Sequence, residues 1–126
     1  MIELEIVTPT RPLLKTLCKS VTLPGSDGEF QVLPGHVPML VGLKPGTVQY
    51  EDKKLVIAAG YAETDGKRVA VICEGAAWPH EIDLASEKTL LEQLEAKLLQ
   101  TTAEDEKNLK AVEAQIESVT ARISVL

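Results

Sequence analysis

Aromatic residues and basic charge are both scarce in this 126-residue chain. Aromatic side chains make up 3% of the sequence, so any core must be mainly aliphatic. There are 13 Lys and Arg residues against 19 Asp and Glu residues, a net charge of −6. Nucleic-acid binding needs clustered cations and usually stacking aromatics, so this composition argues against it. With 44% hydrophobic residues, the chain can still bury a core of ordinary size.

No apolar run is long enough to span a bilayer. The longest, residues 55–62, is short and contains Gly60. The first five residues, Met-Ile-Glu-Leu-Glu, are acidic where a secretory or transit peptide would be basic. We therefore expect no leader, and we expect any membrane association to come only through protein partners.

Cysteine and histidine are too few to build a metal site. Cys18 and Cys73 have no metal-ligand spacing and are expected to be two reduced thiols in the core. His36 and His80 could in principle act as a base or ligand, but each lacks a partner at a useful spacing. They are interpreted as turn or interface residues. No phosphate-binding loop or catalytic triad can be assembled, so we expect no enzymatic activity, no metal and no cofactor.

The first two thirds of the chain has the short-period alternation of β-strands. Strands are predicted over residues 2–6, 21–23, 30–32, 39–41, 47–50, 54–57, 61–64, 68–72 and 77–78, and a further strand is predicted to begin at residues 13–14. Residues 51–53 and Asp65-Gly66-Lys67 are predicted hairpin turns. Closely spaced short strands predict a mainly β sandwich or flattened barrel over residues 1–82.

The hydrophobic period changes to that of a helix at Asp83, a good N-cap residue. Thr101 and Glu104 are predicted to form the capping box of a second helix. The apolar stripes are Leu84, Leu90, Leu91, Leu94 and Leu98, then Leu109, Val112, Ile116, Val119, Ile123 and Leu126. We predict a hairpin of two antiparallel helices over residues 83–126, in which the stripes most simply form each other's core. This part carries a net charge of −4, which argues against binding to an anionic membrane.

Residues 28–38, Gly-Glu-Phe-Gln-Val-Leu-Pro-Gly-His-Val-Pro, combine a short strand with tight turns. Pro34-Gly35 suits a type II turn, and Pro38 restricts the residue before it to extended backbone. We expect a stiff loop that presents Glu29 and His36 at one end of the β domain. Glu29 could also be an ordinary solvated carboxylate.

This segment resembles the signature loop of the ε subunit of bacterial F-type ATP synthases, Gly-Glu-[apolar]-x-[apolar]-x-Pro-Gly-His-x-Pro. Residues 59–63, Ala-Gly-Tyr-Ala-Glu, also resemble that family's Gly-Gly-x-x-Glu segment, with Ala59 in place of the first glycine. The resemblance implies a ten-stranded flattened barrel followed by a helical hairpin. It also implies a non-catalytic central-stalk subunit, active in ATP synthesis driven by proton transport, at the cytoplasmic face of the bacterial inner membrane.

The resemblance further implies partners and contact residues. The partners would be the γ (shaft) subunit, the membrane c-ring and, transiently, the catalytic α and β subunits. The residues expected in the ring- or shaft-contact loop are Gly28, Glu29, Phe30, Pro34, Gly35, His36 and Pro38. In the family the hairpin can detach from the barrel and block ATP hydrolysis. Lys107, Lys110 and Arg122 are the candidates for that inhibitory contact.

Some bacterial members of the family bind ATP through Ile/Leu-Asp-x-x-Arg-Ala at the start of the first helix. Ile82 and Asp83 match this motif, whereas Ser86 and Glu87 replace its Arg and Ala. The planar guanidinium of arginine can donate two hydrogen bonds to a phosphate, which Ser86 cannot replace. Glu87 adds a negative charge close to the position where the phosphate would bind. We therefore expect no ATP site.

Two other classes of function remain open at this point. The chain could be a free-standing β-sandwich adaptor that oligomerises through its hairpin, which light scattering would distinguish from a stalk subunit. A small enzyme is disfavoured because no nucleophile is paired with a base.

Overall fold

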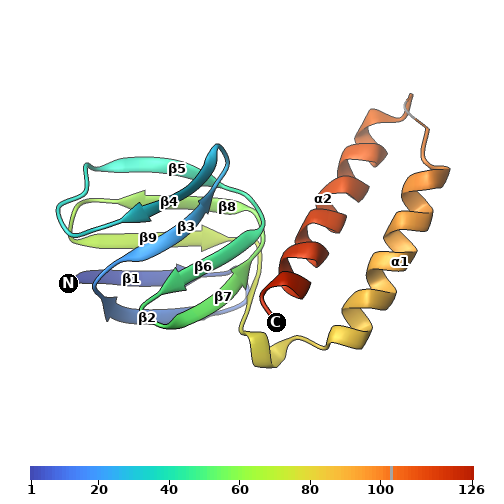
Figure 1. The fold of residues 1–126 in the computed structure, drawn as a ribbon. Helices are drawn as coiled ribbons and strands as arrows, with labels where there is room; N and C mark the ends of the chain where they lie inside the picture. Colours follow the sequence, from blue (N-terminus) through green and yellow to red (C-terminus); the bar gives the residue numbers. More distant parts are fainter. Residues whose placement is uncertain (103) are drawn as a thin grey trace.

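The computed structural model describes residues 1–102 and 104–126 and shows a β domain beside a helical hairpin (Figure 1). The strands are β1 (Ile2–Val7), β2 (Pro12–Cys18), β3 (Val21–Gly25), β4 (Gly28–Val32), β5 (Met39–Leu43), β6 (Gly46–Tyr50), β7 (Lys53–Ile57), β8 (Gly60–Thr64), β9 (Arg68–Cys73) and β10 (Ala76–Ala77). A 3₁₀ turn, η1 (Pro79–Glu81), leads to α1 (Leu84–Gln100) and α2 (Glu106–Ser124). The predicted fold class is confirmed.

The ten strands form one sheet that curls into a nearly closed, flattened barrel. Its order is β10-β7-β6-β3-β5-β8-β9-β1-β2, and β4 pairs with β3 off this path. β1 and β9 are parallel, and the other pairs are antiparallel. Both predicted hairpins are confirmed: β6 pairs with β7, and β8 pairs with β9.

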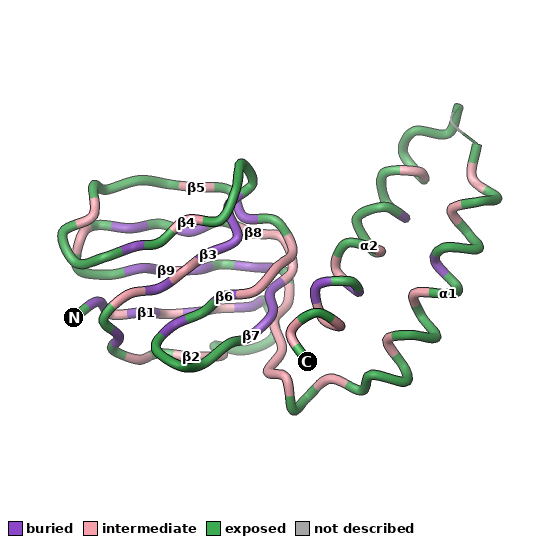
Figure 2. The backbone as a smooth tube through the Cα atoms, viewed as in Figure 1, coloured by how far each residue is buried: buried purple, intermediate pink, exposed green. Residues whose placement is uncertain are grey.

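The barrel core comes from alternate positions of the strands. In β1, Ile2, Leu4 and Ile6 are at most 1% exposed, whereas the intervening glutamates are half-buried. Figure 2 shows buried and half-buried positions along this strand. Among the described residues, every member of this core and every partly buried side chain packed against it precedes Pro79. The core of the barrel is therefore built without the helices. Whether residues 1–82 and 83–126 fold independently stays a prediction.

The hairpin packs its inner helix, α2, against β6 and β7 of the barrel. Asp83 caps α1 as predicted, because its carboxylate accepts a hydrogen bond from the Ala85 N–H. The buried side chains of the hairpin are Leu94 on α1 and Val112, Val119 and Ala121 on α2. The predicted stripes thus face inward, except that Leu84, Leu90 and Leu126 are exposed.

The predicted capping box at Thr101 and Glu104 is wrong. Thr101 ends α1, and its hydroxyl donates to the Lys97 carbonyl at 2.8 Å. Asp105 caps α2, and its carboxylate accepts hydrogen bonds from Asn108. A threonine hydroxyl can satisfy a free carbonyl at the end of the preceding helix, and aspartate is a good N-cap acceptor, so α2 begins after Asp105.

Candidate functional site

The loop after β4 is held to the turn between β8 and β9. The Gly35 N–H donates to the Gly66 carbonyl at 2.8 Å, and the His36 N–H donates to the Leu33 carbonyl at 3.1 Å. The Thr64 hydroxyl donates to the Val37 carbonyl at 3.2 Å. Gly35 has a φ of 84°, which a residue with a side chain rarely adopts. These contacts give the loop the fixed backbone that its proline and glycine residues predict.

Glu29 and His36 do not lie at one end of the barrel, so that prediction is wrong. Glu29 pairs with Pro24 near the β3–β4 turn, whereas His36 follows the other end of β4. Gly28 and Val32, the two ends of β4, are four residue steps apart, about 13 Å at the usual rise of a strand. Glu29 is exposed, and His36 is half-buried with its Nδ1 2.9 Å from the Val37 carbonyl. The signature segment thus presents two separate polar positions.

The His36 end of the segment carries exposed apolar side chains. Leu33, Val37 and Leu40 are 53%, 73% and 69% exposed, and both prolines of the loop are exposed. Large apolar side chains exposed to this degree so close together in the sequence are typical of a protein contact. Phe30 differs from these residues, because it is half-buried and packs against the barrel core.

The Glu29 end of the segment faces the hairpin. Glu29 and Lys44 line a groove of about 420 Å³ together with Glu117 and Ser124 of α2. No ion pair joins these four residues among those the structure describes. The groove between the barrel and α2 therefore has polar side chains on both walls.

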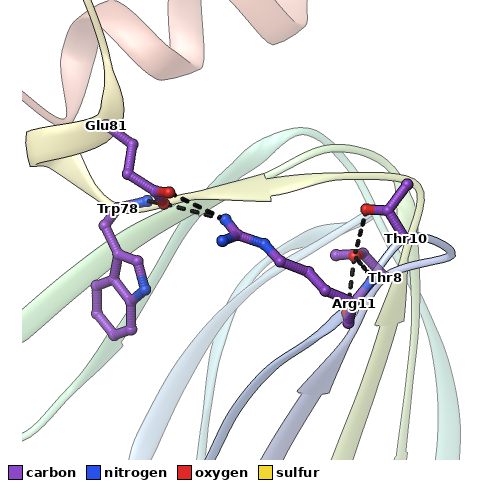
Figure 3. A network of polar contacts seen from close by, with 5 residues as sticks. All are labelled: Thr8, Thr10, Arg11, Trp78 and Glu81. Atoms are coloured by element: carbon purple, nitrogen blue, oxygen red, sulfur yellow. Dashed lines mark hydrogen bonds and ion pairs between the residues drawn. The ribbon is translucent and has the colours of Figure 1, made fainter.

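A polar network ties the segment before α1 to the barrel (Figure 3). The Arg11 guanidinium donates to both oxygens of Glu81, at 3.2 and 3.1 Å. The Trp78 N–H donates to the same carboxylate at 3.0 Å. This backbone bond, then Arg11, holds the pKa of Glu81 below its ordinary value. His80, within this segment, is exposed, and its role as a turn or interface residue stays a prediction.

In the segment that resembles the ATP-binding motif, residues 82–87, the polar side chains of Asp83 and Ser86 cap α1. Asp83 accepts hydrogen bonds from the Ser86 hydroxyl at 2.9 Å and from the Ala85 N–H at 3.1 Å. The Ser86 hydroxyl and the backbone N–H groups lower the pKa of Asp83. Ile82 is half-buried as the residue before the cap. Ser86 is thus engaged with Asp83.

Glu87 and Arg122 form an ion pair between the two helices, with Arg122 Nε 2.9 Å from Glu87 Oε1. No local sequence motif predicts this contact, because the two residues lie 35 positions apart. The available signal was the hairpin register, since a turn between Gln100 and Glu106 brings them to roughly the same level. Lys107 and Lys110, the other two candidate inhibitory cations, are exposed near the start of α2.

We expect no measurable ATP binding by the isolated chain. Glu87 places a carboxylate beside Arg122, and Asp83 is used as the cap, so phosphate would meet negative charge. Isothermal titration should give a Kd weaker than ~1 mM, equivalent to less than about 4 kcal/mol of binding free energy. Saturable micromolar binding would contradict this expectation. Ser86→Arg with Glu87→Ala removes the competing carboxylate and supplies the missing fork, so gain of binding in that variant would support the argument.

Redox, metal and membrane features are few in the described part of the chain. Cys18 and Cys73 are buried and unpaired, as predicted for core thiols. Burial raises the pKa of both thiols, which disfavours the reactive thiolate. Residues 1–102 and 104–126 contain no cluster of metal-ligating side chains. No helix there is both long and apolar enough to cross a membrane.

Residues 1–79 match the family model described as the ATP synthase, Delta/Epsilon chain, beta-sandwich domain. Curated relatives extend the similarity into the hairpin. The ATP synthase epsilon chain of Geotalea uraniireducens (strain Rf4) is 35% identical over 98% of this chain and 92% of its own. That of Trichlorobacter lovleyi is 40% identical over 98% of this chain and 91% of its own.

A solved structure has a similar fold over most of the chain. A chain in the Euglena gracilis mitochondrial ATP synthase (OSCP/F1/c-ring) aligns with a TM-score of 0.80 and 27% identity. The alignment covers 95% of this chain and 78% of that one.

Proposed function

Because this chain belongs to the ATP synthase delta/epsilon family, we propose that it is a non-catalytic rotor subunit that couples the shaft to the membrane ring. The similarity to ATP synthase epsilon chains over nearly the full length carries this proposal. The partners are the γ (shaft) subunit and the c-ring, with transient contacts to the catalytic α and β subunits. Phosphoryl transfer and proton passage belong to other subunits of the complex.

The barrel acts as the coupling element in this proposal. Its exposed apolar loop at Leu33, Val37 and Leu40 offers one contact surface, and Glu29 offers another at the far end of β4. A loop with a fixed backbone loses little entropy on docking, which favours a contact that must transmit torque. The chain reaches the cytoplasmic face of the bacterial inner membrane through these partners.

The hairpin acts as the regulatory element. It packs on the barrel through one helix, and polar groups line part of that interface. Such a limited contact allows a second position, in which the hairpin extends toward the catalytic subunits and inhibits ATP hydrolysis. Lys107 and Lys110 supply exposed cations for that contact, and Arg122 supplies a third when the hairpin opens.

Affinity capture from native membranes tests the assignment. The tagged chain should retain the γ subunit and the c-ring after detergent extraction. Recovery of the chain as a homo-oligomer without other ATP synthase subunits would instead support a free-standing adaptor.

We expect Glu29→Ala and His36→Ala each to reduce the coupling of ATP hydrolysis to ion pumping, without unfolding the protein. Glu29 is exposed, and the ring of the half-buried His36 contacts the backbone of its own loop at Val37. Exposed positions usually contribute under ~0.5 kcal/mol to stability, so the melting temperature should change little. Glu29 lies near one end of β4, whereas His36 follows the other end. Their free-energy effects on coupling should therefore add in the double variant.

Asp52→Ala is the matched control, because it removes an exposed carboxylate from the β6–β7 turn outside the signature segment. Pumping by reconstituted vesicles and melting curves of the isolated chain are the two measurements. A double variant that melts far below the wild type while its surviving complexes couple normally would make the segment structural rather than functional.

A further inference from the structure

The ion pair between Glu87 and Arg122 joins the ends of the helices that the connecting turn does not join. Glu87 lies in the first turn of α1, and Arg122 lies in the last turn of α2. Their 2.9 Å contact is the one ion pair between the two helices among the described residues. Both charges also suit the helix dipoles, since an acid at a helix start and a base at a helix end are favoured.

This pair is more buried than the ion pairs on the barrel. The side chains of Glu87 and Arg122 are 16% and 28% exposed, whereas those of Lys15 and Glu3 are 69% and 39% exposed. Glu87 Oε2 and Arg122 Nε are buried without a hydrogen bond of normal geometry. Two buried charges with few other hydrogen bonds stabilise mainly each other. Removing one partner leaves the other as an unpaired buried charge, which destabilises the closed hairpin.

Arg122 lies where the two helices and the barrel come together. It lines the groove between α1 and α2 with Leu90 and Leu94, and it lines a crevice against Val56 and Ala76 of the barrel. Glu74 is the other charged side chain that lines the groove between the helices. A change in the pair therefore affects both the closure of the hairpin and its docking on β7 and β10.

We propose that the Glu87–Arg122 ion pair is a lock that keeps the hairpin closed and docked, and that hides Arg122 from any outside acidic surface. Opening the hairpin breaks the pair, and the freed guanidinium then becomes available to a partner. This proposal deepens the regulatory role proposed above and rests on it for the second step. The first step, closure of the hairpin, is a property of the isolated chain.

Hydrogen exchange of the full-length chain, followed by mass spectrometry, tests the lock. In Glu87→Gln, amides of α2 should exchange at least about tenfold faster than in the wild type, because the hairpin opens more often. Amides of β1 and β9 serve as an internal reference and should be unchanged. Glu92→Gln is the matched control, an exposed glutamate of α1 without a described ion pair, and should exchange like the wild type.

Exchanging the two charges, in Glu87→Arg with Arg122→Glu, distinguishes the effect of the ion pair from the effect of side-chain size. Glu87→Arg alone places two cations together and should open the hairpin further than Glu87→Gln. Adding Arg122→Glu restores the pair and should recover part of the protection, limited because the reversed charges oppose the helix dipoles. A swap no better protected than its single variants, or wild-type exchange in Glu87→Gln, would overturn the lock. Equal loss of protection in the barrel would overturn it as well, by showing general destabilisation.

The second step is measured on the reassembled ATP synthase. Glu87→Gln should deepen inhibition of ATP hydrolysis, and Glu87→Gln with Arg122→Gln should not, because the freed cation is then missing. If the hairpin opens but hydrolysis is unchanged in both, the lock stands and the role of Arg122 in inhibition is overturned.

Discussion

Gly60→Ala is expected to destabilise the barrel by about 3 kcal/mol or more. A Cβ at this position would lie 2.2 Å from the Ile72 carbonyl oxygen and 2.6 Å from Cys73 Cα. Both are backbone atoms of β9, so no side-chain rotation can relieve the overlap. β8 and β9 would have to separate next to Cys73, which is 3% exposed. For a chain of this size the melting temperature should fall by roughly 10 °C.

Gly75→Ala is the matched control. Nothing lies within 4 Å of a Cβ added at Gly75, and its backbone does not have the positive φ that favours glycine. We expect a change within about 0.5 kcal/mol, measured by denaturant titration of both variants beside the wild type. If Gly60→Ala melts like Gly75→Ala, then β8 and β9 are not packed as closely as described. The second glycine of the Gly-Gly-x-x-Glu-like segment is thus explained by packing, whereas Ala59 is accommodated.

Local patterns in the sequence predict the elements of this fold well. Alternation of Ile2, Leu4 and Ile6 with glutamates is enough to predict β1, because one face of the strand must be buried. Asp65-Gly66 predicts the β8–β9 turn, and Gly66 has the expected positive φ of 91°. The change of period at Asp83 predicts the start of α1. In each case the determining interactions are short-range.

The candidate site is harder to predict, because its geometry depends on contacts between distant segments. Glu29 and His36 are close in sequence, yet most of β4 runs between them. Thr101 has the residue type of a helix start, but the carbonyl it satisfies belongs to the preceding helix. Glu87 and Arg122 meet only when the hairpin closes with one register, which no local motif encodes. Contacts between side chains of the two helices can therefore be assigned only from the tertiary structure.

A chain ending at Ile82 is expected to fold, to bind the shaft and to leave ATP hydrolysis at least as fast as the intact chain does. The barrel core contains no helical residue among those described, so the cut removes no core side chain. The new end is anchored, because Glu81 is paired with Arg11 and Trp78 packs against the core. If the hairpin occupies its inhibitory position half of the time, its removal should raise hydrolysis about twofold.

A chain ending at Ala77 is the control for that truncation. It lacks Trp78 and Glu81 as well as the hairpin, so it loses the anchor of the last segment and should melt at a lower temperature. Melting curves, binding to the γ subunit and hydrolysis by the reassembled complex are compared for the two lengths. Val56 and Ile57 are both 2% exposed and border the crevice between the barrel and α2. Aggregation of the chain ending at Ile82 would therefore show that α2 must cover this apolar surface to keep the barrel in solution. Slower hydrolysis by a folded, shaft-bound truncation would show that the hairpin activates the complex, which would contradict an inhibitory role.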